Sequence, residues 1–308
     1  MTGPTIALTG ATGFIGRHLL RTLSARGYRV RVLLRRPIDT LPEGASGAVV
    51  GDLARPMNMA AALAGVDAVV HSAGLAHAMS GAPEDDFRSS NTEATRHLAE
   101  AAQRAKVRRF VFLSSIRAQT GPSAPAPLGD NDAPAPTDAY GRSKLAAEQA
   151  LASLDLDWVA LRPVLVYGEG VKGNMAALLR LARLPYPLPL GGFSGRRSLV
   201  SVESLSAAVA TALGVAGPLR RPLIVADPDP LTLPEMLGAL REGLDRAPGL
   251  LPVPAPLIGL ACHVTGRREV FDRLAGSLVA RPDGLAALGW SPAFPSREGL
   301  AQLARLSA

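Results

Sequence analysis

Short apolar runs alternate with helical patterns along the first half of the chain. Runs of apolar and β-branched residues predict strands at 5–8, 28–34, 48–50, 68–71, 110–114 and 158–163. Between them, apolar residues that recur every three or four positions predict helices near 15–23, 57–63, 89–105 and 138–152. Strands that alternate with helices of this length form βαβ units with right-handed crossovers. The pattern therefore predicts an α/β fold built on a doubly wound parallel sheet.

The pattern becomes irregular after Tyr167. Prolines gather at 185–189 and 248–256, and the C-terminal third has the pattern of short helices and loops. We predict a sheet domain over 1–167 and a smaller, mainly helical cap over 168–308, with about 197–226 returning to the sheet domain. Ligands commonly bind between two such units. The loop 118–137 is long for a compact domain, which marks it as functional or disordered.

A glycine-rich turn, TGATGFIG over 9–16, joins the first predicted strand to the first helix. Gly10 permits the tight turn, Gly13 lets the backbone approach a pyrophosphate, and Gly16 lets helix and strand pack closely. The free N–H groups at the helix start favour an anion. This context predicts a Rossmann dinucleotide site, with contacts from Gly10, Thr12, Gly13, Phe14, Ile15 and Gly16.

The ends of the next three strands suggest which dinucleotide binds. Arg35 and Arg36 end the second strand, where an acid would bind the ribose of NAD. Arginine at this place accommodates a 2′-phosphate, so NADP(H) is favoured over NAD(H), unless both arginines are merely exposed strand-end residues. Further cofactor contacts are expected from Asp52, Leu53, Ser72, Ala73 and Gly74.

Tyr140 and Lys144 are candidates for acid–base chemistry. They stand four residues apart on a predicted helix, so they share one face. A free phenol has a pKa near 10, and a neighbouring ammonium together with an oxidised nicotinamide lowers that pKa toward useful values. The chain has three lysines, which makes a chance pairing with tyrosine improbable; an exposed pair is the alternative.

Ser114 and Ser115 follow the strand predicted at 110–114. Open α/β sheets bind ligands at the carboxyl ends of their strands, so a hydroxyl here can hydrogen-bond a substrate oxygen beside the tyrosine. Two serines after a strand are also an ordinary turn signal.

Composition and the remaining sequence patterns add further constraints. The formal charge is +7, but the arginines are scattered, so we interpret them as a solvated surface and expect no nucleic-acid or membrane partner. The apolar stretch 249–264 contains prolines and is too short to span a bilayer. The lone cysteine, Cys262, is expected to be buried, and the N-terminus lacks a signal-peptide pattern. We expect a cytoplasmic protein and assign no metal site.

The chain resembles the NAD-dependent epimerase/dehydratase family of extended short-chain dehydrogenases/reductases. The matching segments are TGATGFIG (9–16), GDL (51–53), HSAG (71–74), Asn91, Ser115 with Tyr140 and Lys144, Arg162-Pro163, VYG (166–168), RRSLVSVESL (196–205) and ALGWSP (287–292). The resemblance implies that Tyr140 is the acid/base and that Lys144 holds the nicotinamide ribose. It also implies that Ser115 orients the substrate oxygen, with Ser114 as the alternative.

Two further residues acquire a role through this resemblance. Pro163 is implied as a cofactor contact. Asn91 is similar to a structural and proton-relay asparagine of the family, although a helix cap is an equal interpretation.

The strings SSIRAQTG, DAYGRSKLAAEQ and GRRSLV are most similar to a bacterial subgroup of polysaccharide synthesis that contains sugar-nucleotide 4-epimerases and 4-ketoreductases. This resemblance implies that Asn174, Arg197 and Arg273 contact the nucleotide diphosphate of a nucleotide-sugar substrate. The ordinary alternatives are a helix cap for Asn174 and surface charge for the two arginines. A homodimer is also suggested.

One departure from the family narrows the expected reaction. Dehydratases follow the catalytic Ser or Thr with an Asp–Glu pair, whereas Ile116 and Arg117 follow Ser115 here, so dehydration is not expected. We expect an NAD(P)-dependent oxidoreductase acting at C4 of a nucleotide-diphospho-sugar, reducing a UDP-4-keto-6-deoxyhexosamine. The alternatives are a 4-epimerase of UDP-glucose or UDP-N-acetylglucosamine, a reductase of a small ketone or aldehyde, and a non-catalytic dinucleotide sensor.

Overall fold

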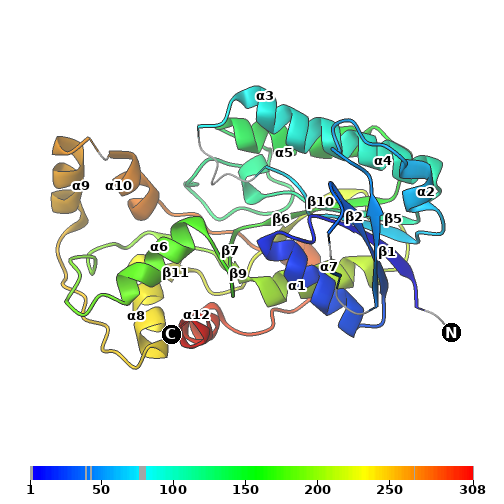
Figure 1. Ribbon diagram of the computed structural model, residues 1–308. Coiled ribbons are helices and arrows are strands. Elements are labelled where there is room, and N and C mark those ends of the chain that lie inside the picture. The colour runs from blue at the N-terminus through cyan, green and yellow to red at the C-terminus, as the bar shows by residue number, and fades with distance from the viewer. Residues whose placement is uncertain (1–2, 39, 42–43, 76–80, 267, 308) are drawn as a thin grey trace.

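A seven-stranded parallel sheet forms the centre of the computed structural model, which describes residues 3–38, 40–41, 44–75, 81–266 and 268–307 (Figure 1). The strands lie in the order β10-β6-β5-β4-β1-β2-β3. Their bounds are β1 (Thr5–Thr9), β2 (Arg29–Leu34), β3 (Ala45–Val49), β4 (Ala68–His71), β5 (Arg109–Leu113), β6 (Trp158–Pro163) and β10 (Arg221–Val225). This order confirms the predicted doubly wound sheet, and β10 pairs with β6 at one edge.

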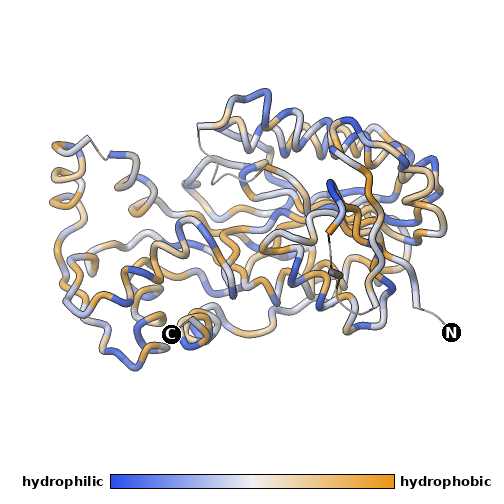
Figure 2. Tube along the Cα trace, in the orientation of Figure 1, coloured by the Kyte–Doolittle hydropathy of each residue, from blue (hydrophilic) through white to orange (hydrophobic). Residues whose placement is uncertain are grey.

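The central strands are buried on both faces. Every residue of β1, β4, β5 and β6 is buried, as expected for parallel strands covered by helices on each side. Figure 2 shows apolar residues concentrated along these strands. The predicted bounds of β4 and β6 are confirmed to the residue, whereas those of β2, β3 and β5 shift by one to three residues.

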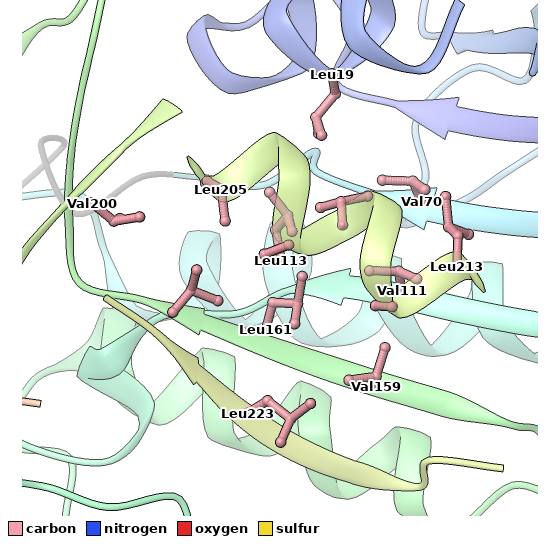
Figure 3. Packing of buried hydrophobic residues seen from close by; sticks show 14 of the residues in the cluster. Leu19, Val70, Val111, Leu113, Val159, Leu161, Val200, Leu205, Leu213 and Leu223 are labelled. Carbon is pink, nitrogen blue, oxygen red and sulfur yellow. The ribbon is translucent and has the colours of Figure 1, made fainter. Parts of the chain in front are cut away.

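Helices cover the two faces of the sheet with separate cores. On one face, α1 (Phe14–Ala25) and α7 (Val202–Gly214) pack against the strands through residues such as Leu19 and Leu205 (Figure 3). The other face is covered by α2 (Met59–Leu63), α4 (Ala94–Arg104) and α5 (Ala139–Ala152). These helices cover the faces of the sheet and not the carboxyl ends of its strands, which is where open α/β sheets bind ligands.

The helix expected over 89–105 is not a single α-helix. It begins as α3 (Glu84–Phe87), continues through a π-helical segment, η2 (Arg88–Glu93), and ends as α4. A π-helical turn adds a residue to the helix and changes which side chain faces inward. Here it contains the buried Asn91, whose amide has partners on two other elements, described below.

The C-terminal part is mainly helical, as predicted. Its own core lies between α6 (Gly173–Ala182), α8 (Leu233–Gly243) and α12 (Ser296–Leu306). Two short strand pairs lie outside the seven-stranded sheet: β7 (Leu165–Tyr167) with β9 (Leu199–Ser201), and β8 (Arg196–Arg197) with β11 (Leu231–Thr232). The remaining helices are α9 (Ala255–Val264), α10 (Arg268–Ala275) and α11 (Asp283–Ala286). The predicted division at residue 167 stays a prediction.

Two of the expectations from the sequence change. Cys262 is only half-buried, because α9 has no fully buried side chain, so the expected buried cysteine is wrong. The long loop after η3 (Ile116–Ala118) is held in place: the Asp130 carboxylate accepts hydrogen bonds from the backbone N–H groups of Ile224 (2.6 Å) and Gly284 (2.9 Å). In the described part of the chain, no helix combines the length and apolarity of a membrane span.

Candidate active site

The glycine-rich turn lies where the strand order reverses, between β1 and β4. Ligands of open α/β sheets bind at this switch point. Gly10 has a φ of +72°, and a Cβ there would lie 2.7 Å from the backbone N of Ala73 in the turn after β4. At Gly16 a Cβ would lie 1.9 Å from the carbonyl oxygen of Gly10. Gly13 is the N-cap of α1 and has no side chain, so the first helical turn is accessible to an anion.

The ends of β2 and β3 bring the predicted adenosine contacts to one corner. Arg35 and Arg36 are exposed after β2. Arg35 Nη2 lies 3.7 Å from Asp52 Oδ2, with 73% and 58% of the two side chains exposed. Asp52 also accepts a hydrogen bond from the backbone N–H of Ala54 (3.0 Å). The half-buried Leu53 lies beside it.

The turn after β4 is bound tightly to the turn after β1. The Ser72 hydroxyl donates to the Thr9 carbonyl (2.7 Å), and the Ala73 N–H donates to the Thr9 hydroxyl (3.1 Å). At Gly74 a Cβ would lie 2.7 Å from Asn91 Oδ1 and 3.3 Å from Lys144 Nζ. A side chain there would collide with the Asn91 amide oxygen and crowd the lysine ammonium.

His71, at the end of β4, links this turn to α4. Its Nδ1 lies 2.7 Å from the Thr9 hydroxyl and its Nε2 lies 3.0 Å from the Thr95 hydroxyl. Thr95 donates its own proton to the Asn91 carbonyl, so it accepts from a protonated Nε2. Burial, followed by the nearby Lys144 charge, lowers the pKa of His71 to about 3. The imidazole is therefore neutral, and it joins the end of β1 to the start of α4.

The helix α5 presents Tyr140 and Lys144 one turn apart. Lys144 Nζ donates to the Leu113 carbonyl at the end of β5 (2.9 Å) and lies 4.7 Å from the centroid of the Phe112 ring. Burial lowers the pKa of Lys144 to about 8, and the Glu148 carboxylate acts in the opposite direction. The ammonium is thus buried at the carboxyl edge of the sheet rather than on the surface, so the exposed-pair alternative is wrong.

Tyr140 lies edge-on to the Phe87 ring, with centroids 6.1 Å apart. Removal from water raises the pKa of the phenol, and a hydrogen bond with the Ser115 side chain acts to lower it. Ser115 is the N-cap of η3, where its hydroxyl accepts from the Arg117 N–H (3.1 Å). The Ser115 hydroxyl and the Tyr140 phenol are therefore neighbours.

Asn91 is connected to Tyr140 through Ser143. Its amide N–H donates to the Ser143 hydroxyl (2.9 Å), which donates to the Tyr140 carbonyl (2.8 Å). Its Oδ1 accepts from the Leu75 N–H (2.8 Å). Because Asn91 lies inside the π-helical segment η2, it is not a helix cap.

A cavity of about 490 Å³ opens beside Ser115 and Tyr140, between the sheet and the C-terminal helices. Asn174 and Arg197 face it from α6 and β8, and Ser198 and Arg117 complete its polar lining. The rest of the wall is apolar and comes mainly from β7, α6, α8, Leu274 and Leu278. Such a cavity suits a ligand with a few polar or anionic groups on a larger apolar contact surface.

Arg197 and Asn174 differ in how they are held. Arg197 Nη1 donates to the Pro122 carbonyl (3.1 Å), and burial, followed by the charge of Arg117, lowers the pKa of Arg197. Asn174 is not a helix cap, because the N-cap of α6 is Lys172. Both side chains remain candidates for substrate contact.

The structure separates the two serines that the sequence left as alternatives. The Ser114 hydroxyl donates to Glu148 Oε1 (2.5 Å) and points into the interior, so it is not brought to the cavity that Ser115 lines. Pro163 ends β6 and is buried. Arg273 belongs to α10, but its side chain lies outside the described residues. Among the described residues, no three His, Cys, Asp or Glu side chains gather as metal ligands.

Sequence reasoning missed a buried ion pair under the site. Arg162 donates to both carboxylate oxygens of Glu148, at 3.0 and 2.5 Å, with 4% and 5% of the side chains exposed. Glu148 stands four residues after Lys144 on the same face of α5. The four-residue spacing from Lys144 to Glu148 was the signal that could have indicated a charged partner for Lys144 on α5.

Comparison with known proteins agrees with this geometry. The model of the NAD dependent epimerase/dehydratase family matches residues 6–220. The chain is 34% identical to a UDP-glucose 4-epimerase of Vibrio cholerae over 97% of this chain and 94% of the relative. It is 32% identical to a 3-diazoavenalumate denitrifying reductase of Streptomyces sp over 96% and 98% of the two chains.

A solved structure of MoeE5 in complex with UDP-glucose and NAD is similar over 98% of both chains, with a TM-score of 0.76 and 26% identity. The family match covers more than half of the chain, and the two relatives extend the similarity over nearly the whole chain. The chain therefore belongs to the NAD-dependent epimerase/dehydratase family of enzymes.

Proposed function

We propose that this enzyme transfers a hydride at C4 of a nucleotide-diphospho-sugar, with Tyr140 as the acid/base. One observation carries the proposal: Ser115 and Tyr140 line the same cavity as Asn174 and Arg197. Acid–base groups and a guanidinium in one cavity suit a substrate that has both a reacting oxygen and a phosphate.

The residues at the switch point fit a dinucleotide. Gly13 begins α1 without a side chain, and the small residues Ser72, Ala73 and Gly74 border the same crevice. When bound, the nicotinamide supplies or accepts the hydride. We propose NADP(H) rather than NAD(H), because Arg35 and Arg36 are exposed directly after β2, and arginine after this strand accommodates a 2′-phosphate.

The chain's own residues move and hold the proton. In reduction, Tyr140 donates its phenolic proton to the oxygen that forms at C4, while Ser115 orients that oxygen. The Lys144 ammonium favours the phenolate that remains. In oxidation the same groups act in reverse, and Tyr140 accepts the proton of the C4 hydroxyl.

The net reaction that we propose is reduction of a UDP-4-keto-6-deoxyhexosamine. The pair of arginines after β2 supports it, since NADPH provides net reducing power in cells. The apolar wall of the cavity supports a sugar without a hydroxyl at C6. Arg197, Asn174 and Arg273 are proposed to contact the diphosphate.

A second candidate is 4-epimerisation of UDP-glucose or UDP-N-acetylglucosamine. The relative from Vibrio cholerae favours it, because that protein matches nearly the whole chain. The same residues would first oxidise C4 and then reduce it from the other face. The two candidates differ in whether reduced cofactor is consumed.

The test is an assay of cofactor oxidation with NADPH and a UDP-4-keto-6-deoxyhexosamine. Wild-type protein should oxidise NADPH, Tyr140→Phe should lose activity by a factor of about 10² or more, and Tyr186→Phe, at an exposed tyrosine, should not. Interconversion of UDP-glucose and UDP-galactose without added cofactor would instead establish the epimerase. Activity of Tyr140→Phe equal to wild type would refute both.

Substrate contact is tested by a matched pair of arginines on β8. Arg197 faces the cavity, whereas Arg196 is exposed and lies 3.5 Å from Glu235. Arg197→Ala should raise KM about tenfold or more, because the proposed charge-assisted contact with the phosphate is lost. Arg196→Ala should leave KM unchanged. Equal KM values in all three proteins would contradict a nucleotide substrate in this cavity.

A further inference from the structure

An ion pair that the proposed reaction does not use joins η3, which Ser115 caps, to the start of the helix that carries Tyr140. The Arg117 guanidinium, from η3, pairs with the Asp138 carboxylate at the start of α5. Arg117 also lines the cavity, although only 13% of its side chain is exposed. A charge pair so close to an acid/base group acts on the charged form of that group.

Asp138 has a structural task that puts a negative charge beside the phenol. It is the N-cap of α5, and its Oδ1 accepts from the Gly141 N–H (2.7 Å). An aspartate in this position stabilises the helix start. It also stands two residues before Tyr140, where a carboxylate opposes formation of a phenolate.

The backbone brings Arg117 to this carboxylate. At Gly141 a Cβ would lie 2.2 Å from the Arg117 carbonyl oxygen, so η3 packs directly against the first turn of α5. A side chain at position 141 would push the two elements apart. The glycine after Tyr140 therefore allows the guanidinium to reach the capping carboxylate.

We propose that Arg117 is a positioning residue that neutralises the capping carboxylate of Asp138, so that Tyr140 can exchange its proton with the substrate. The proposal rests on the acid/base role proposed for Tyr140. It assigns opposite effects to two residues that form one contact. Asp138 holds the proton on the phenol, and Arg117 releases it.

The electrostatics around the phenol agree with this division. Burial has the largest effect and raises the pKa of Tyr140, and the Ser115 hydrogen bond lowers this pKa. The next two effects are smaller: the Asp138 charge raises the pKa and the Arg117 charge lowers it. The two charges thus act against each other at the same phenol.

The other charged groups near Tyr140 come from three directions. Lys144 lies one turn along α5, and Arg197 faces the cavity from β8. From α3, the Phe87 ring contacts Tyr140, and Glu84 on the same helix pairs with Arg142 at the surface (2.9 Å). None of these residues is substituted in the Arg117 and Asp138 variants, so a difference between variants is assigned to the charge that each variant removes.

The experiment is a titration of tyrosinate absorbance in protein saturated with NADP⁺, with the titration of Tyr140→Phe subtracted. The chain has four tyrosines, so the background is small. Arg117→Gln should move the Tyr140 step to higher pH by about 0.5–1 pH unit, and Asp138→Asn should move it to lower pH by a similar amount. Asparagine still caps a helix, so α5 is kept.

Three further variants make the result specific. The double variant Arg117→Gln/Asp138→Asn should titrate near wild type, because both charges are gone. Arg117→Lys, which keeps the charge, should also titrate near wild type. Arg142→Gln, which removes an exposed arginine from the same helix, should have no effect. Circular dichroism at each pH shows that each variant is folded.

The proposal is overturned if both single variants shift the step in the same direction, or if Arg117→Gln titrates as wild type. If Arg117→Gln does not fold, Asp138→Asn alone decides, since a step that does not move to lower pH refutes the proposal. The titration uses no substrate. Failure of the proposed sugar-nucleotide reaction would therefore leave this result intact, and the reverse also holds.

Discussion

Replacing Lys144 by methionine removes a charge that the fold buries, and we expect it to change how stability depends on pH. The pKa of Lys144 falls from 10.5 to about 8 on burial. Between these two values the unfolded chain binds more protons than the folded protein, so the free energy of unfolding rises with pH. From about pH 7 to about pH 9.5 this rise amounts to about 2 kcal/mol. The Lys144→Met variant should lack it.

The assay is urea unfolding of cofactor-free protein at both pH values, because a bound dinucleotide would add its own stabilisation. The difference between wild type and variant cancels every other titrating group. Lys172→Met is the matched control, because Lys172 is an exposed lysine and should keep the wild-type rise. A Lys144→Met protein that gains stability with pH as wild type does would refute the reasoning.

Three other substitutions test the site. Gly10→Ala should weaken NADPH binding about tenfold or more in a fluorescence titration, because its Cβ would meet the neighbouring turn; Gly27→Ala, with a similar positive φ but open space, should bind as wild type. Below pH 6.5, the free energy of unfolding of wild type should fall by about 1.4 kcal/mol per pH unit relative to His71→Asn, since the folded His71 has a pKa of about 3. Parallel curves of unfolding free energy against pH would contradict the burial of His71 as a neutral group. Glu148→Gln should cost about 3–5 kcal/mol in urea unfolding by leaving the Arg162 charge buried, and a loss below about 1 kcal/mol would argue against this.

The sequence predicted the central strands better than the edge. The bounds of β4 and β6 were predicted to the residue, because strands buried on both faces are continuous apolar runs between polar segments. The edge strand β3 was displaced, since its residues are mostly half-buried or exposed and give little apolar signal. The π-helical segment was missed because it depends on the partners of Asn91, which come from distant parts of the chain.

The candidate site was predicted where its chemistry is local. The spacing of Tyr140 and Lys144 and the glycines of the first turn are short-range patterns, and the structure brings Tyr140 to the cavity and Lys144 to the adjoining end of β5. The choice between Ser114 and Ser115 was not local. It depends on the direction in which the chain leaves β5 and on Glu148, which removes Ser114 from the cavity.

The sequence alone determined the doubly wound sheet, the dinucleotide turn and the helix that carries Tyr140, because each follows from periodicity or from glycine geometry over a few residues. Only the tertiary structure decided which charges meet. Arg117 reaches Asp138 across a long loop, and Arg197 reaches the same cavity from β8. Burial and electrostatic effects depend on side chains that lie far apart in the sequence. The proton affinity of Tyr140 is therefore a property of the folded site and cannot be inferred from the motif that contains it.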